Sequence, residues 1–282
     1  MKVKAFLDKA TEKLKAAGIG SARLDVLILL EDALRSDRAL VLAHPESGLT
    51  AFQQKKLNKQ IARRADNEPL AYIRGFSEFY GRRFKVNRRV LEPRPESETM
   101  IELLKKLPKI QNSSIRQAQD KKFKIQIADV GTGSGALGIT AKLEVPNVEV
   151  DLYDIDASAL GVAKHNCALH ELHLKTVKRD LLRNSHKAYD VILANLPYVP
   201  DHWQINRAAA MEPRIAIFGG KDGLDVYRRL FEQLSHFSWR PKYVLTESLP
   251  PQHIKLAQIA REAGFLEHQN QDFIQLFKSQ TV

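Results

Sequence analysis

From about residue 124 onward, short apolar segments of strand length alternate with segments of helical periodicity. The expected strands are Lys124–Asp129, Glu149–Asp154, Leu174–Lys178, Tyr189–Ala194, Lys242–Glu247, a weak one near Leu266–Gln269, and Phe273–Lys278. Helical periodicity fills most gaps, as in Ala157–Leu169, Asp225–Phe237 and His253–Ala263. This alternation predicts an α/β fold with a mostly parallel, doubly wound sheet. Ligands of such sheets bind beyond the carboxyl ends of the strands, so functional residues are expected there.

The first of these strands runs into a glycine-rich turn with the sequence Asp129-Val-Gly-Thr-Gly-Ser-Gly. A helix is expected to begin near Ala136. Glycines at these points permit a tight turn and let a ligand approach the backbone without a Cβ in the way. Two further strands end on acids. Asp154 lies 19 residues beyond Gly135, where a carboxylate can accept hydrogen bonds from both ribose hydroxyls, and Asp180 lies near the place of an adenine edge.

The spacing therefore suits a nucleoside ligand, for which two classes compete. Dinucleotide-binding turns usually read GxGxxG and place pyrophosphate at a helix N-terminus. Here the series from Asp129 to Gly135 is tighter and is led by an acid. A carboxylate would repel phosphate and suits a cationic ligand, so S-adenosylmethionine, with its sulfonium and amino groups, is preferred to a nicotinamide dinucleotide.

The fourth strand ends at Asn195-Leu196-Pro197-Tyr198, beside the place where a methyl group would be presented. A planar nitrogen is a poor nucleophile because its lone pair is delocalised. If the Asn195 side-chain oxygen and the Leu196 carbonyl each accept one N–H, they hold such a nitrogen in line and stabilise its developing charge. Pro197 would make the turn rigid, and Tyr198 could stack on the planar group. The tetrapeptide could equally be only a strand end with a turn.

The first part of the chain is expected to be helical. Helices are predicted over Lys4–Ala17, after a Ser21 cap, and after a Thr50 cap until Asn67 and Pro69. Residues 76–86 alternate around Gly81 in the manner of a β-hairpin. The polar stretch 111–122 is expected to be a mobile loop or linker. We therefore divide the chain into a helical domain (1–74), a hairpin and linker (75–95), and a domain that contains the predicted sheet (96–282).

Composition limits the compartment and the partners. The chain has 282 residues, a net charge of +11 and one cysteine, Cys167. It shows no signal peptide and no run of the ~18 apolar residues that a membrane helix needs, so a cytoplasmic location without membrane contact is expected. Residues 1–124 hold 27 Lys and Arg against 15 Asp and Glu, whereas residues 125–282 hold 17 against 18. The uneven split favours a polyanionic or acidic partner over a merely solvated basic surface.

No metal site is expected. The nine histidines show no metal-ligand spacing. Glu96 and Glu98 are interpreted as acids that favour a helix N-terminus, and Cys167 as a small buried apolar group. Trp203 either closes over a substrate or packs on the core.

Several stretches together resemble one family. Asp129–Gly135 with Asp154 is similar to the seven-strand, Rossmann-like methyltransferases that use S-adenosylmethionine, and Asn195–Tyr198 resembles the (Asn/Asp)-Pro-Pro-Tyr motif of those acting on planar nitrogens. LEPRPESE (91–98) resembles the Pro-Arg-Pro-Glu-Thr-Glu segment of the release-factor glutamine methyltransferases of the HemK/PrmC type. EPRIAIFGGKDGLDVYRRL (212–230) and the helical first part resemble the same family, so that the likeness covers nearly the whole chain.

The resemblance implies methyl transfer from S-adenosylmethionine to the side-chain amide of the glutamine in a release factor's Gly-Gly-Gln motif. It implies that the helical domain docks the factor, with a possible ribosome contact through the basic N-terminal part. The implied cofactor residues are Asp129, Gly131, Thr132, Gly133, Ser134, Gly135, Asp154, Asp180, Leu181 and Asn195. The implied substrate residues are Pro93, Arg94, Pro95 and the catalytic set Asn195, Leu196, Pro197 and Tyr198. Leu196 replaces the family's usual proline, and Glu92 replaces a usual apolar residue.

Two alternatives stay open. Asn-Leu-Pro-Tyr is also the form found in ribosomal RNA adenine dimethyltransferases, but those enzymes carry their extra domain at the C-terminus and have no counterpart of residues 91–98. The other alternative is a catalytically silent, cofactor-binding protein that associates with the ribosome. The intact sequence from Asn195 to Tyr198 argues against it.

Overall fold

The computed structural model describes residues 1–108, 110 and 124–280. The chain divides into two compact units, Met1–Gly75 with Ile205–Met211 and Phe76–Gln204 with Glu212–Val282. The predicted loop at 111–122 lies outside the described residues. The three-part division at residues 74 and 95 stays a prediction. No helix in the described ranges is both long and apolar enough to cross a membrane.

The first unit is helical. Its helices are α1 (Val3–Ala16), α2 (Ala22–Leu34), α3 (Arg38–Ala43), α4 (Ala51–Ala65) and α5 (Leu70–Arg74). Apolar residues at helical spacing in α1, α2 and α4, such as Leu14, Leu30 and Leu57, form its fully buried core. The sequence did not predict α3 and α5, because five or six residues are too few to show a helical period.

The two predicted caps differ. Thr50 accepts a hydrogen bond from the Gln53 N–H and donates its own N–H to the Gln53 side chain, which makes a capping box at the start of α4. Ser21 makes no side-chain cap bond at the start of α2. Its φ of −87° and ψ of 17° are not the extended conformation from which a cap hydroxyl reaches the first turn, so that part of the prediction was wrong.

The second unit begins with the predicted hairpin. Strands β1 (Phe76–Phe79) and β2 (Arg82–Lys85) pair in antiparallel fashion around Gly81, whose φ is +70°. Their alternation buries Phe79 and Phe84 on one side. The single-turn helix η1 (Pro95–Ser97) follows and leads into α6 (Glu98–Lys106), whose first turn contains Glu98 as expected.

The seven predicted strands form one sheet. They are β3 (Ile125–Val130), β4 (Val148–Asp154), β5 (Lys175–Lys178), β6 (Val191–Ala194), β7 (Tyr243–Glu247), β8 (Phe265–Gln271) and β9 (Ile274–Ser279). Their order is β5-β4-β3-β6-β7-β9-β8, and β9 runs in the direction opposite to that of the other six strands. The doubly wound prediction is confirmed. β8 gave a weak signal because Phe265 is its one buried side chain.

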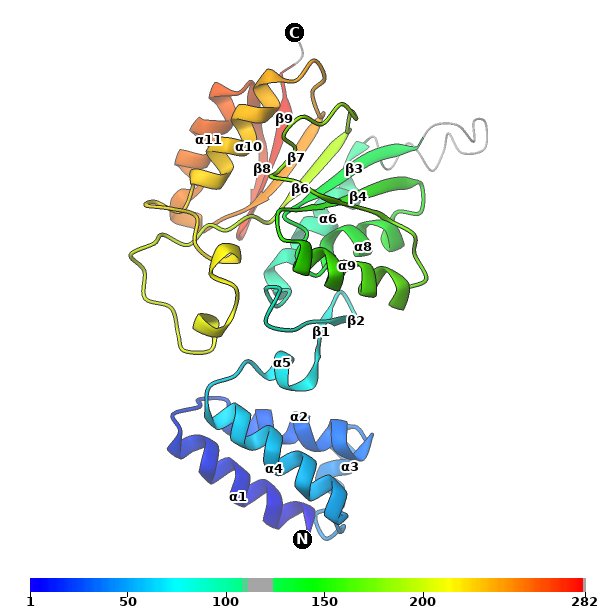
Figure 1. Ribbon diagram of the computed structural model, residues 1–282, viewed down its shortest axis with the longest axis vertical. Coiled ribbons are helices and arrows are strands. Elements are labelled where there is room, and N and C mark those ends of the chain that lie inside the picture. The colour runs from blue at the N-terminus through cyan, green and yellow to red at the C-terminus, as the bar shows by residue number, and fades with distance from the viewer. Residues whose placement is uncertain (109, 111–123, 281–282) are drawn as a thin grey trace. The chain divides into compact units, whose positions relative to one another are not determined.

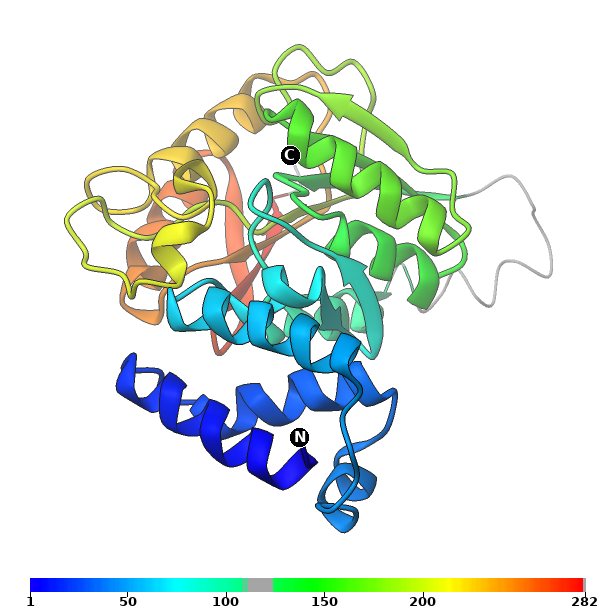
Figure 2. The same cartoon turned by 60° about the horizontal axis from the view of Figure 1, so that its bottom comes forward.

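Helices cover both faces of this sheet (Figures 1 and 2). Helices α6, α8 (Ala136–Glu144) and α9 (Ala157–Leu169) pack on one face, and α10 (Asp225–His236) and α11 (His253–Glu262) pack on the other. Adjacent residues of β3 belong to different layers, since Ile127 packs in the first and Ala128 in the second. A central strand such as β6, with the sequence VILA, is therefore a continuous apolar run.

Strand β3 is where the sheet order switches, because β4 pairs on one side of it and β6 on the other. Asp129 of β3 lies beside Leu193 of β6. The glycine turn after β3 and the tetrapeptide after β6 therefore leave the sheet at the same edge, which is where ligands of doubly wound sheets bind.

Candidate functional site

One pocket of the second unit opens at this edge. Of the predicted site residues, it is lined by Gly131, Thr132, Gly133, Ser134, Asp154, Asp180, Leu181, Asn195, Leu196, Pro197, Pro93 and Arg94. Four predicted residues do not line it: Asp129, Gly135, Pro95 and Tyr198. Segments that are far apart in the sequence, around residues 93, 131, 154, 180 and 195, are thus brought together.

The glycine turn requires its glycines. Gly131, Gly133 and Gly135 have φ of +72°, +55° and +84°, a region that side chains disfavour. A Cβ on Gly131 would lie 2.8 Å from Cδ2 of Leu196, whereas a Cβ on Gly133 would meet nothing within 4 Å. Gly131 thus lets the turn touch the tetrapeptide, and Gly133 faces open space in the pocket.

Asp129 organises the turn from below. Its carboxylate is 1% exposed and accepts hydrogen bonds from Oγ1 of Thr132 at 2.5 Å and from the N–H of Gly138 at 2.9 Å. Burial raises the pKa of Asp129 to about 6. This carboxylate occupies an N–H group in the first turn of α8, and its negative charge would repel a ligand phosphate at that helix terminus.

The glycine spacing itself needs a correction. Gly138 follows Gly135 by three residues, so Gly133, Gly135 and Gly138 do have the GxGxxG spacing that the shorter series left out. A Cβ on Gly138 would lie 2.3 Å from Cδ2 of Leu152, so this glycine lets α8 pack closely on β4. The preference for S-adenosylmethionine therefore depends on the buried acid and not on the spacing.

Both acids at the strand ends lie at the pocket. The Oδ2 and Oδ1 atoms of Asp154 accept the N–H groups of Gly133 and Asp156, each at 2.9 Å, and burial raises the pKa of the Asp154 carboxyl. Asp180 forms an ion pair with Arg229 of α10, which also lines the pocket. Each carboxylate has further lone pairs with which it could accept ligand hydroxyl or amino groups.

The Asn195 carboxamide is held by its nitrogen. Its Nδ2 donates to Oγ of Ser97 at 2.9 Å and to Oε2 of Glu247 at 3.0 Å. Among the described residues, no donor binds the Oδ1 atom of Asn195 or the carbonyl of Leu196. Both residues line the pocket, so two acceptors stand together there.

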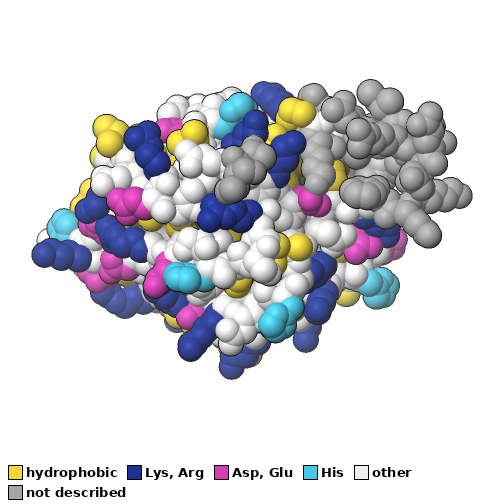
Figure 3. All heavy atoms as spheres, turned by 90° about the horizontal axis from the view of Figure 1, so that it is seen from above, with side chains coloured by type: hydrophobic (Ala, Val, Ile, Leu, Met, Phe, Trp, Pro, Cys, Tyr) yellow, Lys and Arg dark blue, Asp and Glu magenta, His cyan; other side chains and the backbone are white. Residues whose placement is uncertain are grey.

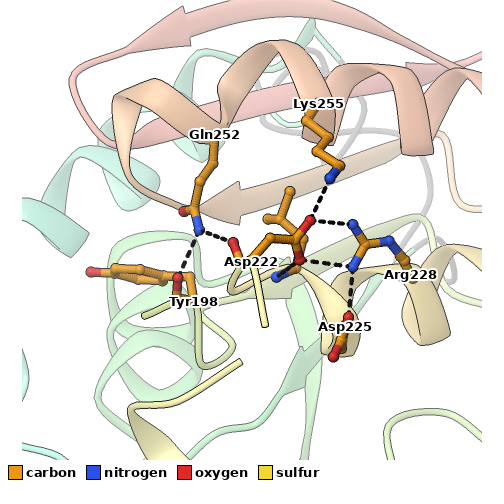
Figure 4. A network of polar contacts seen from close by, with 7 residues as sticks. Tyr198, Asp222, Asp225, Arg228, Gln252 and Lys255 are labelled. Atoms are coloured by element: carbon orange, nitrogen blue, oxygen red, sulfur yellow. Dashed lines mark hydrogen bonds and ion pairs between the residues drawn. The ribbon is translucent and has the colours of Figure 1, made fainter. Parts of the chain in front are cut away.

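Tyr198 is half-buried and is not among the residues that line the pocket. Its hydroxyl donates to Oε1 of Glu247 at 3.0 Å, and burial, followed by the negative charge of Glu247, raises the pKa of the phenol. Its carbonyl accepts from Nε2 of Gln252 at 2.8 Å, and the same nitrogen donates to the carbonyl of Asp222 (Figure 4). The Asp222 carboxylate is in turn bound by Arg228 and Lys255, which lowers its pKa.

The stretch after the tetrapeptide folds back over it. The N–H of Val199 donates to the carbonyl of Ile217 at 3.0 Å, and the N–H of Gly219 donates to the carbonyl of Val199 at 2.9 Å. A Cβ on Gly219 would lie 2.3 Å from the Pro197 carbonyl oxygen, and one on Gly223 would lie 2.0 Å from that of Tyr198. These glycines allow the backbones to meet.

Glu92 has charged and polar partners at the pocket. Its Oε1 accepts from Oγ of Ser77 at 3.1 Å, its Oε2 lies 3.6 Å from Arg94, and its N–H donates to Glu212 at 3.0 Å. Glu212 is buried and also binds Arg94 at 2.5 Å. The acid thus stands in an ionic cluster, which explains how this position tolerates a departure from an apolar residue.

Sequence reasoning missed three residues that hold the tetrapeptide: Ser97, which lines the pocket, and Glu247 and Gln252, which do not. Two of them carried a readable signal. Glu247 is another acid at the end of a predicted strand, and Ser97 lies inside the segment 91–98. Gln252 had no signal, because it acts through main-chain carbonyls that lie 30 and 54 residues away in the sequence.

The remaining predictions concern single side chains. Cys167 is buried, as expected. Trp203 is 47% exposed and is not among the residues that line the pocket. Within the part of the chain that the structure describes, no group of three or more His, Cys, Asp or Glu side chains could hold a metal ion.

Comparison with known proteins gives matches over most of the chain. Residues 5–75 match the model of the PrmC N-terminal domain, and residues 113–212 match that of the methyltransferase small domain. A release factor glutamine methyltransferase of Koribacter versatilis is 37% identical over 240 residues, 83% of this chain and 81% of the relative. One of Coxiella burnetii is 34% identical over 248 residues, 87% of this chain and 85% of the relative.

A solved structure shares the fold. The hMettl16 catalytic domain, in complex with the MAT2A 3′UTR hairpin 6, has a TM-score of 0.52 and 14% sequence identity, and the match covers 83% of each chain. At this identity the likeness concerns the fold alone.

Proposed function

The chain belongs to the release factor glutamine methyltransferases, and on that premise we propose that it methylates the glutamine side-chain amide of the Gly-Gly-Gln motif in peptide chain release factors. The methyl donor is S-adenosylmethionine. The observation that carries the proposal is the pair of acceptors, Oδ1 of Asn195 and the Leu196 carbonyl, at the pocket that the glycine turn also lines.

The residues on one side of the pocket suit the donor. Gly133 offers the backbone without a side chain in open space, and Asp154 offers a carboxylate to the ribose hydroxyls. Asp180 and Leu181 would hold the adenine. Asp129 would act from beneath the turn, since its carboxylate is bonded to Thr132 and Gly138. S-adenosylmethionine, when bound, supplies an electrophilic methyl group on a sulfonium.

The two acceptors suit a primary amide. A glutamine side-chain nitrogen has two N–H groups, so Asn195 and Leu196 can take one each and fix the plane of the amide. Hydrogen bonds that a nitrogen donates while it becomes positively charged contribute about 1.5–3 kcal/mol each. Holding the nitrogen in line with its reaction partner contributes about 7–11 kcal/mol. Pro93 and Arg94 line the same pocket and would contact the substrate loop.

The proposal can be tested by incubating the protein with radiolabelled S-adenosylmethionine and either a release factor or ribosomal subunits. We expect label in the release factor, and none when the glutamine of its Gly-Gly-Gln motif is replaced. Ribonuclease-sensitive label in the subunits would instead support an RNA adenine methyltransferase, the alternative that the sequence Asn-Leu-Pro-Tyr left open. No label in either, with the donor still bound, would support a silent binding protein.

Two substitutions separate the roles. Asn195→Ala should abolish transfer while the donor still binds, because it removes an acceptor for the substrate nitrogen. Asp154→Ala should instead raise the dissociation constant of the donor, measured by calorimetry. Unimpaired turnover of the first variant, or an unchanged dissociation constant of the second, would contradict the assignment.

A further inference from the structure

Glu247 stands at the carboxyl end of β7 and is 1% exposed, although it is an acid. Three side chains donate to it. Oε2 accepts from Oγ of Ser97 at 2.5 Å and from Nδ2 of Asn195 at 3.0 Å, and Oε1 accepts from the hydroxyl of Tyr198 at 3.0 Å. A buried carboxylate is costly unless its lone pairs are used in this way.

As long as Glu247 is ionised, the donors and acceptors around Asn195 allow only one orientation of its carboxamide. An ionised carboxylate can only accept hydrogen bonds, so the atom of Asn195 that faces Glu247 must be the NH₂ group. The Ser97 hydroxyl donates its one hydrogen to Glu247. Its oxygen can therefore only accept a hydrogen bond from Asn195. A flipped Asn195 would place its oxygen against two acceptors, with no donor between them.

We propose that Glu247 and Ser97 are positioning residues that lock the Asn195 carboxamide with its oxygen toward the substrate amide. This inference rests on the proposed function. Ser97 belongs to the segment 91–98, and Glu247 ends β7, the strand next to β6, which Asn195 follows, so these contacts join segments 150 residues apart in the sequence. The segment 91–98 thereby has a role in the reaction beyond lining the pocket.

The same lock reaches the rest of the tetrapeptide. Because Oε1 of Glu247 holds the Tyr198 hydroxyl, one carboxylate orients the first and the last residue of Asn195–Tyr198. The Tyr227 hydroxyl donates to the main-chain carbonyl of Glu247 and accepts a hydrogen bond from the N–H of Leu196. The two acceptors for the substrate nitrogen are therefore both set from the end of β7.

Exchange of the acid and the amide tests the lock. In Asn195→Asp two carboxylates face each other, so one must take up a proton or move, and we expect kcat to fall by about tenfold or more. Adding Glu247→Gln restores one carboxylate and one amide in reversed positions. The introduced glutamine can donate to the introduced aspartate and to Ser97 and accept from Tyr198, so the double variant should recover at least about tenfold in kcat over Asn195→Asp.

Removal of the lock is the complementary test. Glu247→Met keeps an apolar chain of similar length without acceptors, and kcat should fall by about 10- to 100-fold while the dissociation constant of S-adenosylmethionine stays unchanged. Ser97→Ala should lower kcat, and Ser97→Thr, which keeps the hydroxyl, should restore it. A double variant no better than Asn195→Asp, or a Glu247→Met variant with wild-type kcat, would overturn the proposal.

One measurement does not depend on the substrate. The Asn195 side-chain amide protons should exchange slowly with solvent in the wild type, as followed by nuclear magnetic resonance, and at least about tenfold faster in Glu247→Met. If the wild type transferred no methyl group to a release factor but showed this difference, the proposed function would fail and the lock would stand. Equal exchange rates in both proteins would overturn the lock, whatever the substrate.

Discussion

The backbone N–H of Leu196 donates to the hydroxyl oxygen of Tyr227, 3.2 Å away. A proline, which the family usually has at this position, could not make this bond because it lacks an N–H. The same hydroxyl lies 3.0 Å from the carbonyl of Ala194 and 2.5 Å from that of Glu247. Tyr227 therefore joins the ends of β6 and β7, and the leucine offsets the loss of proline rigidity with an added hydrogen bond.

Tyr227→Phe should lower the free energy of unfolding by about 1–3 kcal/mol, because it leaves buried main-chain groups without a partner. Its cost should be smaller in a Leu196→Pro background, where one of those groups is already absent. Urea denaturation of the wild type, the two single variants and the double variant measures this coupling. Strict additivity of the two changes would show that the bond contributes nothing.

Gly138 and Gly161 form a matched pair of helical glycines. A Cβ on Gly138 would lie 2.3 Å from Leu152 and 2.8 Å from Asp129, whereas one on Gly161 would meet nothing within 4 Å. Gly138→Ala should destabilise the protein by about 1–3 kcal/mol through overpacking and weaken donor binding. Gly161→Ala should stabilise it by about 0.5–1 kcal/mol through helix propensity. Equal effects in urea denaturation would refute the close-packing role of Gly138.

The sequence predicted the centre of the sheet well because strands such as β6 and β7 are buried on both faces and alternate with helices. Strands β3, β6 and β7 differ from their predicted bounds by one or two residues at their ends. It also predicted which turns converge, since parallel strands that neighbour a switch point leave the sheet at one edge. The short helices α3 and α5 were not predicted because six and five residues span fewer than two turns, so no apolar period repeats.

The side-chain hydrogen bonds around the pocket could not be predicted from the sequence. Asp129 stays a predicted donor-site residue, and local periodicity gave no sign that its carboxylate accepts hydrogen bonds from Thr132 and Gly138. Ser97, the last residue of η1, reaches Glu247 because the following helix α6 packs on β7. Such contacts depend on tertiary packing, about which local periodicity carries no information.

The pKa of Asp129 predicts a pH dependence of stability. Burial raises that pKa from 3.8 to about 6, so the folded state holds the proton more tightly than the unfolded state. The resulting stabilisation is fully present below pH 3.8 and is lost as the pH rises through about 6, a change of about 3 kcal/mol. In Asp129→Asn this titration is absent, while an oxygen can still accept from Thr132 and Gly138.

The difference in unfolding free energy, wild type minus Asp129→Asn, should therefore fall as the pH rises from about 4 to 7. Urea denaturation of both proteins over this range measures it. The other carboxyl groups titrate in both proteins and cancel in the difference, apart from Asp154, whose charge interacts with that of Asp129. Parallel curves for the two proteins would mean that Asp129 is not the titrating group.

The basic charge of the first part is concentrated after the helical unit. Residues 1–75 hold 14 Lys and Arg against 9 Asp and Glu, whereas residues 76–124 hold 13 against 6. The hairpin strand β2 presents Arg83 and Lys85 to solvent, and Arg89 lines the pocket. On the face drawn in Figure 3, by contrast, Lys and Arg are interspersed with Asp and Glu. A substrate that carries negative charge near its reactive loop should therefore be attracted by the hairpin.

Charge reversal tests this attraction. Arg83→Glu with Lys85→Glu should raise KM for the release factor by about tenfold at low ionic strength, and less in high salt, because exposed charges are screened. Donor affinity should not change. Lys278→Glu is the control. It also replaces a positive charge by a negative one, but on β9, which contributes no residue to the pocket, and it should leave KM unchanged. Steady-state kinetics over a salt series distinguishes attraction by the hairpin from attraction by the net charge of the protein. An equal rise of KM in Lys278→Glu would mean that only the net charge matters.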